Sequence, residues 1–373
     1  MPRPKRVGGV GAAGGRGRVS MADVAQAAGV SAQTVSRVLS GRGIVRDSTR
    51  AAVDDAVRRL GYQPNLAART LATGRTRRLG IILTESTSTA RIMVEAGAQA
   101  ACRRLGYRLT SAVVSTTGIR SLRRAADQLR SDGVEGIIVA APVTARDRWT
   151  PKGFPVVSLD DASAGSPEFV TDQRAIGRLA TEHLLELGHR TVWCVCGPAQ
   201  WPEAKARVEG WHAALTAAGV VVPEVLHGDW TPHEGYRMGR LLAEDPSVTG
   251  IFAASDELAI GAMHALWDAG RAVPDEVSVV GVDDIPIAAH LCPPLTTVRQ
   301  PFARLTDAAV RLLVSKLEHR AASAGDDGLD TQLTRPSLIV RSSTAAPASG
   351  TDGTHRSRVA QVDASGAGGR RVR

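Results

Sequence analysis

The sequence has no long hydrophobic segment. None of its apolar runs approaches the length that spans a bilayer. The N-terminus, MPRPKRVGGVGAAGGRGR, is basic and lacks the apolar core of a secretory signal. These absences predict a cytoplasmic protein without a membrane partner.

Cysteine is scarce, with four residues scattered over the chain. Two of them, Cys194 and Cys196, alternate in the apolar run TVWCVC, and we expect them to point to opposite faces of a strand and not to share a metal ion. Reduced thiols packed in a core are the expected state. The sequence therefore predicts no metal and no other cofactor.

Signatures of catalysis are missing as well. The sequence has no nucleophile elbow, no phosphate loop in the required context and no cluster of metal ligands. A literal GxGxxG between Gly9 and Gly14 has no strand before it, so it does not indicate a nucleotide site. We expect the protein not to be an enzyme.

Negative charge is lacking mainly at one end of the chain. Up to Arg78 there are 15 lysines and arginines against 4 acidic residues, a balance of +11, whereas the remainder has 31 against 33. A basic head on a near-neutral body is typical of a protein that binds a polyanion.

The basic end contains three short helical patterns, over residues 21–28, 32–39 and 48–60. Ser20 and Ser31 are expected to cap the first two helices, and Gly29 interrupts the chain between them. Two short helices joined by a tight turn that contains glycine form a helix-turn-helix. We predict a DNA-binding domain over residues 19–63, preceded by a disordered basic tail over 1–18.

From Leu79 onward, apolar runs of strand length alternate with amphipathic helical stretches. The runs are LGIIL (79–83), YRLTSAVV (107–114), GIIVA (136–140), PVVSL (155–159), TVWCVC (191–196), GIFAA (250–254) and VSVVGV (277–282). This alternation predicts an α/β fold of parallel sheets with helices on both faces. The stretch is longer than one typical sheet, so we expect two lobes over residues 79–343. The remainder, 344–373, is expected to be a disordered tail.

Head and body together resemble one known family. VSMADVAQAAGVSAQTVSRVLSG, followed by TRAAVDDAVRRLGYQPNLAARTLATGRT, is similar to the head and hinge of the LacI/GalR repressors. The body continues the similarity through LGHR (187–190), RVEGWHAAL (207–215), GDW (228–230), SDELAIGAM (255–263), VSVVGVDD (277–284) and PPLTTVRQPF (293–302). The resemblance implies a helix-turn-helix head, a hinge helix and linker over 64–78, and a periplasmic-binding-protein-like body whose small-molecule effector controls DNA binding.

The resemblance also assigns residues that contact DNA. Ala32, Gln33 and Arg37 fall at positions that face base edges, where Gln33 can bond adenine and Arg37 guanine. Phosphate contacts are expected from Ser31, Thr34, Ser36 and Thr49, although helix capping is an equally good interpretation of each Ser or Thr. In the hinge, the DNA-binding residues are Asn65, Arg69 and Leu71, with Leu71 as a wedge in the minor groove. Packing of Leu71 against the body is the alternative.

Further matching positions are expected to bind the effector: Asp160, Arg207, Trp230, Ser255, Asp283, Gln300 and Phe302. A sugar needs groups for paired hydroxyls, which Arg207 and Asp283 offer, and an aromatic face, which Trp230 offers. Taken singly, Arg207 could be a surface charge, Trp230 a core residue and Asp283 a turn residue. Arg91 and Glu203 are two further hypothetical polar contacts.

The expected assembly is a homodimer. Two heads on a two-fold axis require a near-palindromic operator, and residues 345–373 contain no leucine, so they lack the C-terminal leucine heptads of tetrameric family members. The sequence thus predicts a nucleoid-associated repressor that a sugar induces. The alternatives are a corepressor-dependent regulator with a non-sugar effector, and a sugar-binding module without DNA. A hydrolase that uses Asp160 and Asp283 is disfavoured, because paired carboxylates also bind hydroxyls in sensors.

Overall fold

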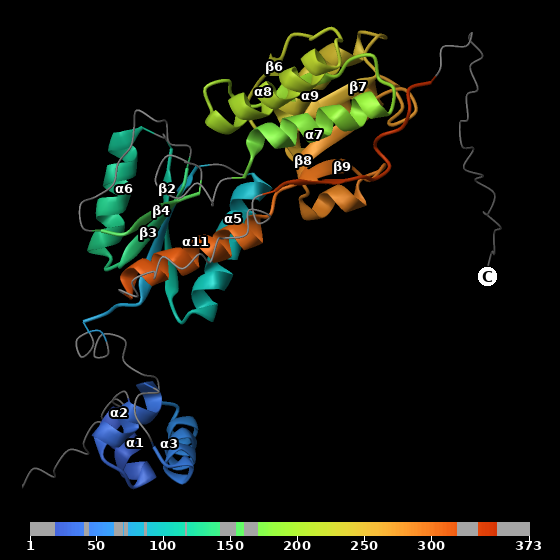
Figure 1. Cartoon of the computed structure of the whole chain (residues 1–373). Helices are drawn as coiled ribbons and strands as arrows, with labels where there is room; N and C mark the ends of the chain where they lie inside the picture. Colours follow the sequence, from blue (N-terminus) through green and yellow to red (C-terminus); the bar gives the residue numbers. More distant parts are fainter. Residues whose placement is uncertain are drawn as a thin grey trace, which may run out of the picture. The chain divides into compact units, whose positions relative to one another are not determined.

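A computed structural model describes residues 19–40, 45–62, 70, 74–85, 88–115, 118–141, 154–159, 171–318 and 335–348. The chain divides into two units, Met1–Arg77 and Arg78–Arg373, and each is described by itself (Figure 1). The expected disordered tail over 1–18, the hinge residues 64–69 and 71–73, and residues 349–373 of the expected C-terminal tail lie outside the described residues.

The first unit contains α1 (Met21–Ala28), α2 (Ala32–Ser40) and α3 (Asp47–Leu60). The Ser20 hydroxyl accepts from the Asp23 amide, and the Asp23 carboxylate accepts from the Ser20 amide at 2.7 Å, which completes a capping box. Gly29 ends α1 in the left-handed region, at a φ of 65°, which a residue with a side chain adopts reluctantly. The helices enclose one apolar core of Val24, Ala25, Val35, Val38, Val53, Ala56 and Tyr62.

The second unit begins with a four-stranded parallel sheet in the order β2-β1-β3-β4. Its strands are β1 (Arg78–Thr84), β2 (Arg108–Val114), β3 (Gly136–Ala140) and β4 (Val156–Ser158). One face is covered by α5 (Thr89–Arg104) and α11 (Phe302–Leu317), and the other by α6 (Ile119–Ser131). We call this part the first lobe.

The second lobe is built on a six-stranded sheet in the order β10-β9-β8-β7-β5-β6, in which only β10 is antiparallel to its neighbour. Its strands are β5 (Trp193–Cys196), β6 (Leu226–His227), β7 (Gly250–Ala253), β8 (Ser278–Asp283), β9 (Thr296–Arg299) and β10 (Ser337–Ile339). A short 3-10 helix, η3 (Pro286–His290), follows β8. The helices α7 (Gln173–Glu186) and α8 (Pro202–Ala217) cover one face, and α9 (Pro232–Ala243) and α10 (Asp256–Asp268) cover the other.

The two lobes share the chain. It enters the second lobe after β4, returns to the first after β9 and enters the second again before β10. Figure 1 shows α11 beside α5, and the α11 side chains Leu305, Ala309 and Leu313 pack in the core of the first lobe. The two-lobed body of parallel sheets that the sequence predicted is confirmed.

The body extends further at both ends than the sequence indicated. Arg78 was placed in the linker, but it is the first residue of β1. The C-terminal tail was expected to begin at residue 344, but the amide of Ala345 donates to the Ser278 hydroxyl at 3.0 Å, and the carbonyl of Ala345 accepts from the same hydroxyl. Pairing with β8 therefore holds the chain at least to Ala345.

The expectation that Cys194 and Cys196 point to opposite faces is wrong. Residues two apart on a strand share a face, and both thiols are buried in the same core between the sheet and α7 and α8. Their expected state as reduced, packed thiols agrees with their free side chains. Within the described part of the chain no group of acidic, histidine and cysteine side chains could hold a metal ion. The described helices also include none with the length and apolar character to cross a membrane.

Candidate functional site

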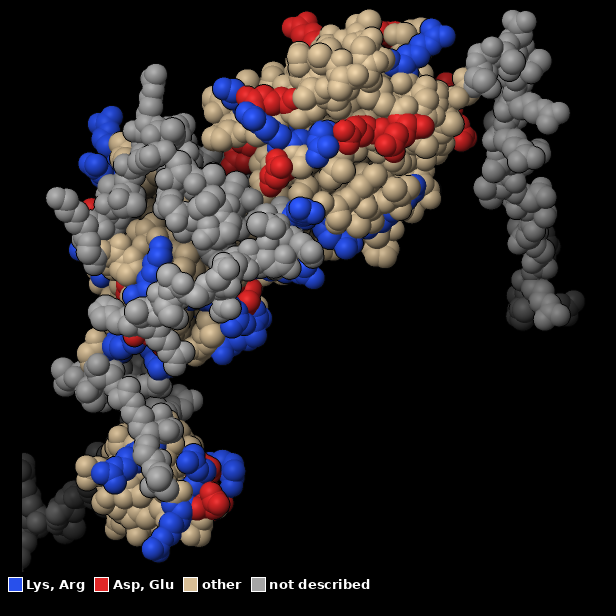
Figure 2. Space-filling view, in the orientation of Figure 1, with Lys and Arg blue, Asp and Glu red and all other residues tan. Residues whose placement is uncertain are grey.

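The exposed face of α2 carries the residues expected to read DNA. Val35 and Val38 point into the core of the first unit, whereas Ala32, Gln33 and Arg37 are exposed on the opposite arc of the helix, together with Ser36. Helical spacing separates the two sets, because residues three and four apart share a face. Figure 2 shows basic side chains spread over the surface of this unit, and in its described part all of them are arginines.

Ser31 caps α2. Its hydroxyl accepts from the Thr34 amide at 3.2 Å and bonds the Thr34 hydroxyl at 2.9 Å. The capping role is therefore present, and a phosphate contact by either hydroxyl stays a prediction. Thr49 is half-buried in the first turn of α3. The three hinge residues assigned to DNA, Asn65, Arg69 and Leu71, lie outside the described residues.

A cavity of about 390 Å³ lies between the two lobes of the body. It is lined by residues at the carboxyl ends of β1, β3 and β8, where ligands of open parallel sheets are usually bound. Six of the seven predicted effector residues line it, namely Arg207, Trp230, Ser255, Asp283, Gln300 and Phe302. The hypothetical contacts Arg91 and Glu203 line it too, and Asp160 lies outside the described residues.

Four side chains in the cavity form a continuous relay of hydrogen bonds. Arg207 on α8 donates from Nε to Gln173 Oε1 at 2.7 Å, and Gln173 donates from Nε2 to Gln300 Oε1 at 3.0 Å. Gln300, which follows β9, donates from Nε2 to Asp283 Oδ1 at 2.5 Å. Arg207 Nη1 also donates to the Ala254 carbonyl. This Arg207–Gln173–Gln300–Asp283 line, which we call the relay, fixes donors and acceptors from four elements in one place.

Asp283 is only 3% exposed and has a φ of 109°, a conformation that is strained for a residue with a side chain. Burial raises the pKa of Asp283 to about 7 and nearby Glu257 adds to the rise, whereas Arg207 and the hydrogen bond from Gln300 oppose it. Asp283 is thus a buried acceptor whose charge is sensitive to what enters the cavity.

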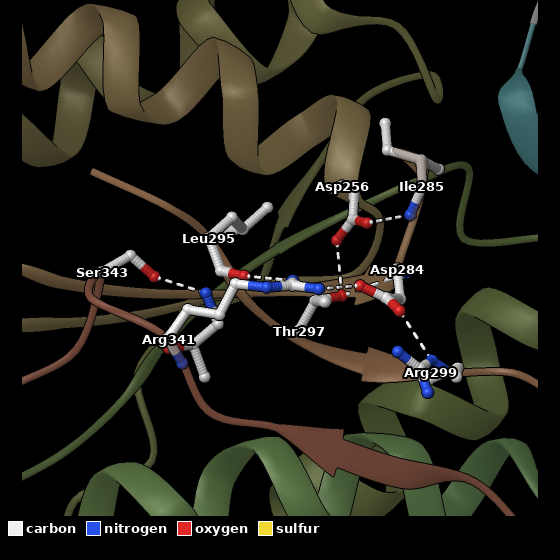
Figure 3. A network of polar contacts seen from close by, with 9 residues as sticks. Asp256, Asp284, Ile285, Leu295, Thr297, Arg299, Arg341 and Ser343 are labelled. Atoms are coloured by element: carbon white, nitrogen blue, oxygen red, sulfur yellow. Dashed lines mark hydrogen bonds and ion pairs between the residues drawn. The ribbon is translucent and has the colours of Figure 1, made fainter. Parts of the chain in front are cut away.

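The turn after Asp283 is held by a second layer of polar contacts (Figure 3). Asp284 is ion-paired with Arg299 at 2.6 Å and with Arg341 at 2.5 Å, and Arg341 also donates to the Leu295 carbonyl at 2.7 Å. Asp256 belongs to the same network and accepts from the amide of Ile285 at 2.8 Å and from the hydroxyl of Thr297 at 2.6 Å. Several contacts thus hold the same turn in place, and together they can maintain the strained backbone at Asp283.

Two tryptophans form the aromatic part of the cavity. The Trp201 and Trp230 rings are 5.9 Å apart between centroids and tilted by 59°, and the Arg207 guanidinium carbon is 5.6 Å from the Trp230 centroid. Gly197 packs so closely against the Trp230 ring that a Cβ at this position would clash with it. Among the described residues, Trp230 Nε1 is buried and has no hydrogen-bond partner.

Two acids that line the cavity have incomplete hydrogen bonding. Glu257 Oε1 accepts from the Thr89 amide of the first lobe at 2.7 Å, but its Oε2 is buried and has no partner in the described structure. Glu203 Oε2 is in the same condition, and burial raises the pKa of Glu203 while Arg207 lowers it. Ser255 caps α10 by accepting from the Leu258 amide at 3.2 Å, so its contact with an effector stays a prediction.

Sequence reasoning missed two residues of this site, Gln173 and Glu257. Gln173 lies in none of the quoted family motifs, and Glu257 lies in SDELAIGAM (255–263) without an assigned role; the fold brings both to the cavity. Two other polar side chains are engaged elsewhere in the second lobe. The Trp211 indole donates to the Val192 carbonyl at 2.9 Å inside the second lobe. His189 bonds the Thr249 hydroxyl at 3.0 Å.

Two family models match the chain. The one described as bacterial regulatory proteins, lacI family, matches residues 20–65, and the one described as a periplasmic binding protein-like domain matches residues 181–344. The first covers the described helices of the head and the second covers most of the second lobe.

The chain is also similar to characterised proteins over most of its length. The transcriptional repressor PurR of Haemophilus influenzae is 32% identical over 86% of this chain and 97% of its own. The ribose operon repressor of Escherichia coli is 31% identical over 80% and 93%, and the regulator CelR of Thermobifida fusca is 34% identical over 81% and 93%.

Solved structures show the same similarity. The Lac repressor dimer bound to operator and the anti-inducer ONPF has a TM-score of 0.74 at 29% identity, over 88% of this chain and 99% of that one. A complex of CelR with cellobiose has a TM-score of 0.61 at 29% identity, over 87% and 100%.

Proposed function

The chain belongs to the LacI family of bacterial regulatory proteins, and from that premise we propose that a sugar bound in its cleft controls the binding of its helix-turn-helix head to operator DNA. It is a DNA-binding transcriptional repressor that responds to a small molecule. The finer points, namely the sugar, the residues that bind it and the direction of control, are our proposal.

The relay is the observation that carries the sugar proposal. It places a guanidinium, two amides and a carboxyl side by side in the cavity, and paired hydroxyls on a ring need such alternating donors and acceptors. Trp201 and Trp230 supply apolar ring surface next to the relay. The solved complex of CelR with cellobiose supports the same ligand class.

The cavity is proposed to bind its ligand without converting it. Its two central charged groups have structural partners, because Gln300 donates to Asp283 and Arg207 donates to Gln173. The characterised relatives are named as repressors and regulators. The protein therefore works where its operator is, in the cytoplasm on the chromosome.

The DNA contacts are proposed on the exposed arc of α2. Gln33 and Arg37 read base edges in the major groove, Ala32 packs against a base and Ser36 contacts the backbone. Ser31, Thr34 and Thr49 bind phosphates, and Asn65, Arg69 and Leu71 bind at the centre of the site. A homodimer places two such heads on a near-palindromic operator, as the operator complex of the Lac repressor dimer supports.

Ligand and DNA are proposed to be linked through the contacts between the lobes. The Thr89 amide of the first lobe bonds Glu257 of the second, and Gln300 of the relay directly precedes the chain's return to the first lobe at α11. A ligand that binds one arrangement of the lobes more tightly shifts the population toward it. We propose that the favoured arrangement releases DNA, so that the sugar is an inducer.

A gel-shift assay tests this function. A duplex is first selected from a random library with the full chain, and ribose, cellobiose, lactose and other sugars are then added. We expect at least one sugar to release the duplex. Arg207→Lys should bind the duplex normally but respond at least tenfold more weakly, because Lys cannot reproduce the planar fork of donors.

The matched control is Arg178→Lys on the exposed side of α7, where Arg178 is paired with Glu182. It should leave both duplex binding and release unchanged. Failure of the wild-type protein to bind any duplex at low salt would overturn the proposal. So would a normal sugar response by the Arg207→Lys variant.

A further inference from the structure

We propose that the cavity selects its ligand by charge, taking a neutral or amino-bearing sugar and rejecting a phosphorylated or acidic one, and that Glu203 and Glu257 impose this selection. The inference rests on the proposed function and names the chemical class of its ligand. It is based on two observations. One carboxylate oxygen of each acid has no hydrogen-bond partner among the described residues, and the arginines that line the cavity are already bonded to other side chains.

The basic side chains in the cavity are already engaged. Among the described residues that line it, three are arginines, Arg91, Arg174 and Arg207. Arg91 is paired with Glu95 at 3.2 Å and Arg174 with Glu209 at 2.7 Å, while Arg207 belongs to the relay. A phosphate group would have to compete with these partners for every guanidinium that it meets.

Two acidic side chains of the cavity, by contrast, each have one oxygen without a donor among the described residues. Glu257 is 8% exposed and its Oε2 has no partner within the described structure, and the same is true of the buried Glu203 Oε2. Both residues also lie in the first turn of a helix, α10 and α8, where the helix dipole favours negative charge. In its ionised form a carboxylate only accepts hydrogen bonds, and a buried acceptor without a donor destabilises the protein. Burial raises the pKa of Glu203, and a backbone hydrogen bond and Arg207 oppose that rise, so a donor supplied by a ligand would also favour the charged form of Glu203.

A bound ligand can supply those donors. Hydroxyl and ammonium groups donate to a carboxylate, whereas a fully ionised phosphate or carboxylate cannot and adds like charge beside the two acids. The buried Trp230 Nε1, which has no partner among the described residues, supplies one donor in return. Hydroxyls satisfy both kinds of group, because each can donate and accept.

Isothermal titration calorimetry on the full chain tests the selection. The probes are mono- and disaccharides in matched forms, including glucose with glucosamine and glucose 6-phosphate, ribose with ribose 5-phosphate, and cellobiose with cellobionic acid. In every set that binds, the neutral or amino form should bind at least tenfold more tightly than the anionic form. Glu257→Gln and Glu203→Gln, which remove the charge and keep the shape, should each reduce that ratio at least threefold.

Glu182→Gln is the matched control, because Glu182 lies on the exposed side of α7, away from the residues that line the cavity, and is paired with Arg178. It should leave the ratio unchanged, and gel shifts show that each variant is folded. An anionic form that binds as tightly as its neutral parent overturns the inference and leaves the proposed function standing. If no sugar of any charge binds, the proposed function falls and the inference falls with it.

Discussion

A single buried carboxyl, Asp283, links stability and ligand binding. Its pKa of about 7 lies above the 3.8 of an exposed aspartate because burial disfavours the charge. Between these values the folded protein holds the proton more tightly than the unfolded chain does. The free energy of unfolding contributed by Asp283 is therefore greatest at low pH, falls as pH rises from about 4 to about 7, and is level above that.

Asp283→Asn should stabilise the ligand-free protein at pH 8, because the amide has no charge to bury and can still accept from Gln300. We expect a gain of about 2 to 4 kcal/mol at pH 8 that disappears toward pH 4, together with loss of the sugar response. Urea unfolding at several pH values measures it. Asp275→Asn, at an exposed position before β8, is the control, and a variant less stable than its parent at pH 8 would contradict this account.

The residues of the cavity differ in how far the sequence could predict them. Arg207, Trp230, Asp283 and Gln300 follow from a family resemblance, and all four line the cavity. The position of Glu257 at the lobe contact could not be predicted, because its carboxylate accepts a hydrogen bond from the Thr89 amide of the first lobe, 168 residues away in the sequence. Contacts of that kind depend on how two lobes meet, which no local pattern encodes.

At the scale of elements, the three helices of the head were predicted to within one residue at each end, because their ends are determined locally. Ser20 with Asp23 starts α1, and Gly29 and Gly61 end α1 and α3 in left-handed conformations. The buried strands β1, β3, β7 and β8 were predicted in the same way, from apolar runs that match their burial. The strands β6, β9 and β10 were missed. β6 and β10 have two and three residues at a sheet edge and show no periodicity, and β9 is mostly polar in sequence although three of its four residues are buried.

Two substitutions at Ser31 can distinguish its capping of α2 from a contact with DNA phosphate. Ser31→Asn and Ser31→Asp should both keep the cap, since either side chain accepts from the Thr34 amide as Ser31 does. If Ser31 also contacts phosphate, only the aspartate repels DNA. We expect Ser31→Asp to bind the selected duplex at least tenfold more weakly and Ser31→Asn to bind within threefold of wild type, as measured by gel shift. Equal binding by the two variants would leave Ser31 with its capping role alone.

At the scale of the whole molecule, we expect the chain to form a homodimer through an apolar surface of the body. Trp267 on α10 is 75% exposed, and His264 beside it contacts Tyr236 of α9 with ring centroids 5.0 Å apart. An aromatic cluster of this kind on a protein surface usually marks an interface. The solved relative with operator is a dimer.

Trp267→Glu should convert the dimer to monomer or raise its dissociation constant at least tenfold, because the substitution places a charge in the apolar contact. Light scattering coupled to size-exclusion chromatography measures the mass at several concentrations. Val221→Glu is the control, since Val221 is 76% exposed outside this cluster. A wild-type tetramer, or a Trp267→Glu variant with unchanged mass, would contradict the prediction.

The route of the chain through the body restricts how this protein can be recombined. Because α11 lies between β9 and β10 in sequence but packs in the first lobe, no contiguous gene segment encodes either lobe. A recombination junction inside the body would replace an element that packs in the core of one of the lobes. A single junction at Arg77 and Arg78 separates the head from the whole body. New pairings of operator and effector are therefore accessible by exchanging heads, whereas sensory specificity must change by point substitution within an intact body.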